Sequence, residues 1–408
     1  MRSSLALVTC ALSLAACADV DSNHASADGV SRSTDALLDS DGIRLERPGD
    51  LDRPDEIDGP DIGDLQFPGD LDRPQQKPGV NLRDGDCQDW PDSPFTSSTI
   101  KGNLTSFDRI QPWTTSITGD VVLSGDANLD SVQALRCVEH IGGTLRIEGQ
   151  PGVERIVMQN LRQVGALEIQ SMDNLKVLRM HGLQDVGSIT IADAPALEVM
   201  RLPQVASLPD GLALEGLSME SLQSVLPALE EAGSVSLIDM PQLASFMHDP
   251  IDVYGGAVEL SGLDAMEQLV GFPFEDVGDL VISDNVALQS TAGASVQDGA
   301  PVEISQNPVL ADLDVIAAAT ALGATNIFEN AALENLDGFA GVKLVEGDLV
   351  IADHAALIDT AGLDALGRVQ GDLRITGATA LSAEELAALE LSLSEVEVTG
   401  ALEVAGAE

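Results

Sequence analysis

The stretch GDLVIADHAALIDTAGLDALGRVQGDLRITG, residues 347–377, contains one short pattern twice, as GDLVI at 347–351 and as GDLRI at 371–375. Each copy reads Gly-x-φ-x-φ, where φ is an apolar residue and the second φ ends an expected strand. Such alternation is typical of a strand with one buried face. Four more apolar residues follow the first copy: Leu357, Leu363, Leu366 and Val369. A strand, a corner and an apolar return segment together predict one turn of a coil.

The pattern recurs along most of the chain. The second φ falls at positions 123, 147, 169, 191, 214, 237, 260, 282, 304, 327, 351, 375 and 398, in steps of 22, 23 or 24 residues. One turn cannot bury its apolar edge alone, whereas stacked turns share a continuous core. We therefore expect a mainly β fold over residues 86–408, a right-handed parallel β-solenoid or leucine-rich-repeat-like superhelix of about 13 turns. Short helices are expected in some turns, at 311–322 and after the capping-box sequence Ser382–Glu385.

Two strings carry a resemblance to a known family, the one at 347–377 and GDLVISDNVALQSTAG at 278–293. They resemble the receptor L-domain family, a leucine-rich-repeat-like solenoid, over roughly residues 100–405. The cysteine-rich modules of the receptors are absent, and the chain has more turns than a single L domain. The resemblance therefore implies an extracellular recognition scaffold, and it does not imply hormone binding.

The N-terminus reads as a targeting segment. Arg2 precedes an apolar run from Leu5 to Ala16, which is too short to span a bilayer as a helix and predicts a signal peptide at 1–16. The run ends in Leu-Ala-Ala-Cys, which resembles the lipobox of bacterial lipoproteins and implies lipidation of Cys17. The alternative is an ordinary cleavage site beside an incidental cysteine. By the sorting pattern of that family, Ala18 after the cysteine implies a lipid anchor in the outer membrane.

Residues 17–85 are rich in Asp, Pro, Gly and Ser and nearly repeat themselves, as RPGDLDRP at 47–54 and FPGDLDRP at 67–74. Such a composition buries too little apolar surface to offset ordering, so we expect a disordered tether. Of the cysteines outside the signal peptide and lipobox, only Cys87 and Cys137 remain. In an oxidising compartment they predict one disulfide, which would stabilise a loop of about 50 residues by on the order of 4 kcal/mol. Two free thiols are the alternative.

The charge distribution restricts the partners. The net charge is −47, and between Arg201 and Lys343 there are 22 Asp and Glu but no Lys or Arg. This field repels phosphate backbones, which excludes nucleic acid as a partner. It favours cationic partners or diffuse binding of divalent cations, or it serves solubility alone as a solvated acidic surface.

No sequence pattern predicts catalysis, a cofactor or a defined metal site. The five histidines have no metal-ligand spacing, so each is expected at the surface or in a corner. Asp39–Gly42 lacks the acids that a calcium loop needs at its first and last positions. A once-per-turn column of Asp and Asn after the strands is expected to form tight corners, with a cation-binding ladder as the alternative: Asp193, Asp239, Asp284, Asn307, Asn330 and Asp353.

The best candidate binding surface is the outward column of the expected strands, which includes Arg146, Glu168, Glu259, Glu303 and Arg374. It has no stacked aromatic residues of the kind expected in a sugar-binding sheet. Phe272, Phe274 and Tyr254 could anchor a partner or pack over the core. Trp90 and Trp113 are expected to cap the first turn. The sequence thus predicts a non-enzymatic recognition or adhesion scaffold for an unknown protein or glycan. The alternatives are a structural envelope protein and, more remotely, a carbohydrate-active enzyme on a β-solenoid.

Overall fold

The structure is a computed structural model that describes residues 98–104, 110, 114–124, 135–246, 251–253, 255–269 and 274–406. All of them belong to one compact unit, Val80–Glu408. The expected signal peptide, Cys17, the tether at 17–85, Cys87 and both tryptophans lie outside the described residues. The interpretations of these parts therefore stay predictions.

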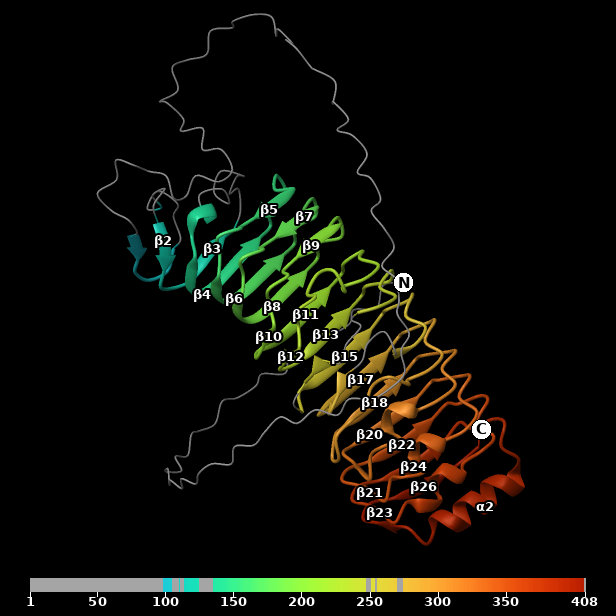
Figure 1. Cartoon of the computed structure of the whole chain (residues 1–408). Helices are drawn as coiled ribbons and strands as arrows, with labels where there is room; N and C mark the ends of the chain where they lie inside the picture. The colour runs from blue at the N-terminus through green and yellow to red at the C-terminus, as the bar shows by residue number, and fades with distance from the viewer. Residues whose placement is uncertain are drawn as a thin grey trace, which may run out of the picture. The chain divides into compact units, whose positions relative to one another are not determined.

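The fold is a mainly β solenoid of parallel strands, as the repeat predicts, and one 15-stranded sheet runs along it (Figure 1). Its strands are β1 (Ser98–Ile100), β2 (Thr114–Ile117), β4 (His140–Glu148), β6 (Gln163–Gln170), β8 (Asp185–Ala192), β11 (Gly211–Glu215), β13 (Val235–Ile238), β15 (Ala257–Ser261), β17 (Asp279–Ser283), β18 (Val302–Ser305), β20 (Thr325–Phe328), β22 (Leu349–Ala352), β24 (Leu373–Thr376) and β26 (Leu402–Val404), in that order. The remaining strand, β3 (Val121–Leu123), pairs with β4. We call this the main sheet.

Three smaller parallel sheets form the other sides of the turns. The first contains β5 (Arg155–Val157), β7 (Val177–Arg179) and β9 (Val199–Arg201). The second contains β10 (Ser207–Leu208), β12 (Glu231–Ala232), β14 (Ile251–Asp252) and β16 (Phe274–Glu275). The third contains β19 (Ala321–Leu322), β21 (Leu344–Val345), β23 (Arg368–Val369) and β25 (Glu397–Val398).

The apolar positions of the repeat form the core. Twelve of the thirteen second-φ residues lie in the main sheet, and each is at most 1% exposed. The thirteenth, Val398, lies instead in β25 of a side sheet, and β26 is the strand that pairs with β24. One turn runs from one second-φ residue to the next, so the twelve in the main sheet bound eleven turns. The fold therefore has about 11 turns rather than 13.

Helices replace strands in several later turns. Among the described residues, the 3-10 helices of these later turns are η4 (Asp314–Ile316), η5 (Asp337–Phe339) and η6 (Ala361–Ala365), and the α-helix α2 (Ala383–Leu393) lies in the last turn. A further 3-10 helix, η2 (Leu135–Cys137), precedes β4. The capping box of α2 is confirmed, since the Glu385 N–H donates to Ser382 Oγ at 3.3 Å and the Ser382 N–H donates to Glu385 Oε2 at 2.7 Å.

The expected helix at 311–322 is reduced to η4. One reason is that the Thr291 N–H of the preceding turn donates to Asp312 Oδ1 at 2.9 Å, which ties the chain before η4 to the neighbouring turn. The other is that Ala321–Leu322 pairs as β19. Too few residues remain between these two fixed points for a longer helix.

Candidate functional site

The outward column of the main sheet is the surface that the sequence predicted, and its residues do lie in register. Arg146, Glu168, Thr190 and Ala213 face one another on consecutive strands, and the register continues through Glu259, Glu303 and Arg374 to Glu403 on β26. Side chains on one face of paired strands are direct neighbours. The column is therefore a continuous strip that a partner can contact over many turns.

Charge in this strip is paired at its two ends. Arg146 Nε donates to Glu168 Oε2 at 2.6 Å, and Arg374 Nη2 lies 2.6 Å from Asp372 Oδ2. Between these ends the column holds only the acids Glu259 and Glu303 and no base. Surface ion pairs of this kind are worth little for stability. The middle of the strip is thus mildly acidic, with partly buried neutral side chains between the carboxylates.

One aromatic residue on this face was missed from the sequence. Phe328 lies in the next outward column of β20 and is partly buried, in register with Ser305 and Ala352. The pattern Gly-x-φ-x-φ ends at the second φ, and Phe328 lies one residue beyond that position.

Phe274 is not part of a binding surface. Its side chain is 1% exposed and packs against Phe246, with ring centroids 5.8 Å apart. The alternative that it packs in the core is therefore confirmed, and its place among the candidate surface residues was wrong. Phe272 and Tyr254 lie outside the described residues, so their role stays a prediction.

The Asp and Asn residues after the strands form two columns instead of one. The first turns the chain in the left-handed region, with φ between 50° and 69°: Gly149, Ser171, Asp193, Gly216, Asp239, Gly262, Asp284, Gln306, Glu329, Asp353 and Gly377. Glycine and short polar residues tolerate this conformation best. The corner interpretation is thereby confirmed for the four aspartates.

Asn307 and Asn330 belong to the second column, one residue further on and inside the fold. With Asn285 they are 0% exposed, and the side chain of each accepts a backbone N–H from the turn before it. The distances are 2.9 Å from Leu263 N, 3.1 Å from Asn285 N and 3.0 Å from Asn307 N. These amides satisfy buried backbone groups, which is a structural task. We call this column the asparagine ladder.

His354 ends the asparagine ladder. It is a corner residue as expected, but it is 1% exposed, so a surface position is wrong for it. Its Nδ1 lies 3.3 Å from the Asn330 N–H and its Nε2 lies 3.1 Å from the Ile327 carbonyl, an arrangement that the neutral ring protonated on Nε2 satisfies. Burial lowers its pKa, and the hydrogen bonds that the protonated ring donates to the Asn330 and Ile327 carbonyls, together with the Asp353 charge, offset only part of that effect.

Carboxylates with shifted pKa values are scattered rather than gathered. Hydrogen bonds from Thr320 N, Ala321 N and the Thr320 hydroxyl lower the pKa of Asp298. Burial raises the pKa of Asp279 on the main sheet. Within the described ranges no three His, Cys, Asp or Glu side chains form a group that could hold a metal ion.

Arginines without an ion pair, on and near the small β5-β7-β9 sheet, are the least expected feature of the described residues. Residues 136–201 contain seven Lys and Arg and eight Asp and Glu, in a chain of net charge −47. In the part of the chain that the structure describes, four arginines of this segment form no ion pair: Arg155, Arg162, Arg179 and Arg201. Arg179 and Arg201 lie in register on neighbouring strands.

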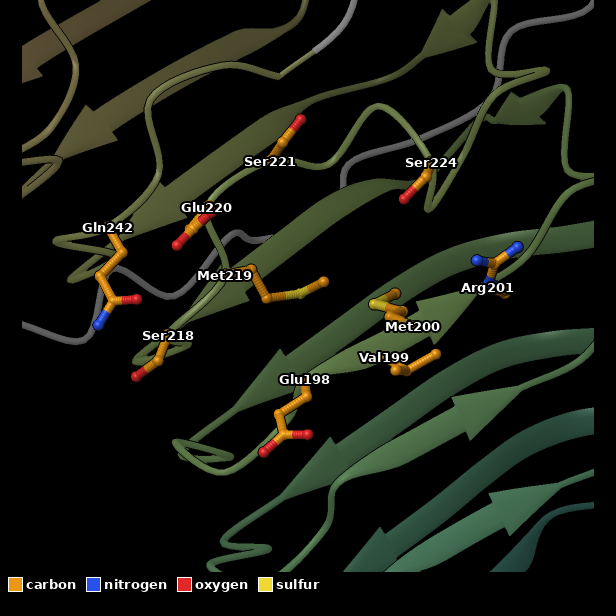
Figure 2. Close-up of a pocket in the computed structure, with 10 residues that line it drawn as sticks. All are labelled: Glu198, Val199, Met200, Arg201, Ser218, Met219, Glu220, Ser221, Ser224 and Gln242. Atoms are coloured by element: carbon orange, nitrogen blue, oxygen red, sulfur yellow. The ribbon is translucent and has the colours of Figure 1, made fainter.

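Arg201 lines a groove of about 400 Å³ (Figure 2). Ten residues line it: Glu198, Val199, Met200, Arg201, Ser218, Met219, Glu220, Ser221, Ser224 and Gln242. The sequence did not predict it, because it depends on how two neighbouring turns pair and not on a residue pattern. The only sequence signal nearby is Arg201 itself, the last base before the basic-free stretch.

Three further observations concern the disulfide, membrane-spanning segments and the relatives of the chain. Cys137 is 6% exposed and is not a free residue, but Cys87 lies outside the described residues, so their pairing stays a prediction. Over the described ranges, no helix is both long enough and apolar enough to cross a bilayer. Comparison with protein-family models, curated proteins and solved structures finds no match to this chain.

Proposed function

We propose that the chain is a non-enzymatic recognition scaffold of the bacterial envelope, anchored by lipid at Cys17, which binds a protein or glycan through the outer face of the main sheet. The observation that carries the proposal is the in-register outward column from Arg146 to Arg374. A rigid sheet presents such a column at a fixed spacing of about 4.8 Å per strand. Preorganised surfaces bind with little ordering cost.

The character of the face indicates the kind of partner. Its middle carries Glu259 and Glu303 and has no base nearby, because residues 202–342 contain none. Complementary charge steers association and suppresses wrong partners. A cationic region of a protein, or a glycan bearing amino groups, fits this strip better than an anionic polymer.

The test uses the full chain as bait against a crosslinked envelope extract. A Glu259→Lys/Glu303→Lys variant reverses charge on the strip, and a Glu230→Lys/Glu267→Lys variant makes the same change at exposed positions off the main sheet. We expect a discrete partner whose capture is lost with the first variant and kept with the second. Equal capture by both variants would place the interaction elsewhere. If the bait captures no partner, and if the protein is abundant and its deletion weakens the envelope, a purely structural role would be favoured.

A further inference from the structure

The groove arises where the solenoid changes from one kind of turn to another. β9 is the last strand of its sheet, and the next turn's residue Ser221 pairs onward with Ser245 instead. The Leu202 N–H still donates to the Val225 carbonyl at 2.8 Å, so the two turns rejoin beyond β9. Two neighbouring turns thus separate and meet again, which leaves the groove between them.

The groove has an apolar floor and a polar wall. Met200 and Met219 are 2% and 7% exposed and form the floor. Methionine is flexible and polarizable, so it adapts to ligands of different shape. Three serines and Gln242 supply groups that both donate and accept. Ser221 Oγ accepts from Gln223 N at 3.3 Å and from Ser245 Oγ at 3.1 Å, which leaves its own proton available to donate.

Opposite charges line the groove without neutralising each other. In Figure 2 Arg201 lies toward one end, Glu220 lies toward the other, and the methionines lie between them, while Glu198 lies to one side with its carboxylate directed away from Glu220. Glu198 and Arg201 are three residues apart along an extended segment, so their Cα atoms are about 10 Å apart. In the described structure neither glutamate forms an ion pair with Arg201. Arg179 lies in register beside Arg201 but does not line the groove.

We propose that this groove binds a short peptide of two or three residues by both of its charged ends. The peptide carboxylate pairs with Arg201, its ammonium group pairs with Glu220, and an apolar side chain rests on Met200 and Met219. Guanidinium and carboxylate form strong charge-assisted hydrogen bonds. The hydroxyls and the Gln242 amide serve the peptide bonds between the ends.

The net charge of the protein helps to select this ligand. At −47 the field disfavours polyanions even though arginines are present, whereas a peptide with one charge of each sign carries no net charge. The groove volume of about 400 Å³ lies toward the small end of ligand sites, which span roughly 300–1,000 Å³. This site lies off the main sheet, so the inference goes beyond the proposed function and does not depend on it.

The experiment titrates the full chain with Ala-Met-Ala, with its C-terminal amide and with its N-acetyl form, by calorimetry or ligand-observed NMR. We expect each cap to weaken binding by about tenfold or more, because each removes one charged contact. In Arg201→Gln the free peptide and its amide should bind within about twofold of each other, since the partner of the carboxylate is gone. In Glu220→Gln the N-acetyl cap should lose its effect in the same way.

Arg155→Gln is the matched control, because Arg155 is exposed, forms no ion pair with any residue that the structure describes, and lies on the same small sheet but two strands from β9. It should leave all three titrations unchanged. Absence of binding by Ala-Met-Ala would overturn the proposal. So would equal sensitivity to amidation in the Arg201 variant and the parent, or binding of free methionine as tight as that of the tripeptide. None of these results would alter the capture experiment on the main sheet.

Discussion

Replacing Asn307 by alanine tests whether the asparagine ladder holds the turns together. The Asn307 side-chain amide donates to the Ile282 carbonyl at 3.0 Å and to the Ser305 carbonyl at 2.8 Å. Its oxygen accepts the Asn285 N–H at 3.1 Å. The residue is 0% exposed, so water does not already solvate these groups. Alanine at this position leaves them without the partners that asparagine supplies.

The expected loss follows from the number of groups left unpaired. The Asn285 N–H and the Ile282 carbonyl each lose a partner, at about 1–3 kcal/mol per buried group. The free energy of unfolding should therefore fall by about 2–6 kcal/mol, toward the lower end if a water molecule enters the space. Urea denaturation followed by circular dichroism measures the loss. Hydrogen exchange measures it locally, and the Asn285 amide should exchange faster than in the parent.

Asn326→Ala is the matched control, because Asn326 lies in the outward column of the neighbouring strand and is partly exposed. We expect it to change stability by no more than about 0.5 kcal/mol, as most surface substitutions do. If Asn307→Ala is as mild as the control and the Asn285 amide remains protected, the ladder does not stabilise the stack and the reasoning is refuted.

Three other substitutions test separate features. His354→Asn should reduce the pH dependence of stability. Because the pKa of His354 is lowered in the folded chain, the unfolded chain takes up a proton at this residue as pH falls below about 6.5, while the folded chain does not. The free energy of unfolding of the parent therefore falls by up to about 1.4 kcal/mol per pH unit until the folded-state pKa is reached. Urea denaturation of variant and parent at pH 7.5 and at pH 5.5 checks this, and an equal change in the free energy of unfolding between the two pH values for both proteins would contradict it. Phe274→Ala should destabilise the chain by about 3–5 kcal/mol by emptying the space beside Phe246, and a loss under about 1 kcal/mol would show that the site is not a packed core. Ser382→Ala should cost about 1 kcal/mol and speed hydrogen exchange in the first turn of α2, whereas unchanged exchange there would mean that the cap is dispensable.

The repeat predicted the main sheet well because one physical rule produces both. Turns that are built alike close over the same number of residues, within a residue or two, so Ile169 and Ile191 recur 22 residues apart and pair in register. The same rule misled at the end of the chain. Val398 keeps the spacing, but α2 lengthens that turn, and Val404 pairs with Ile375 in its place.

The candidate site was less predictable, since it depends on contacts between turns. Asn307 and Asp284 follow their strands at adjacent positions, yet one points inward and the other turns the chain with φ of 57°. The first residue after a strand turns the chain and the second points into the core, and the residue types alone do not distinguish these two positions. The groove beside Arg201 results from a missing strand pair, which leaves no trace in the spacing.

The length of the last turn has a consequence for how such a chain can change. The step from Ile375 to Val404 is 29 residues, against 22 from Ile169 to Ile191, and both steps keep the main sheet in register. The side of the last turn that carries α2 therefore accommodates the additional residues, while the main sheet keeps its register. Insertions grafted on that side of the last turn should diversify the molecule without rebuilding its sheet. The helical side and the main sheet can therefore change independently, by mutation or by design.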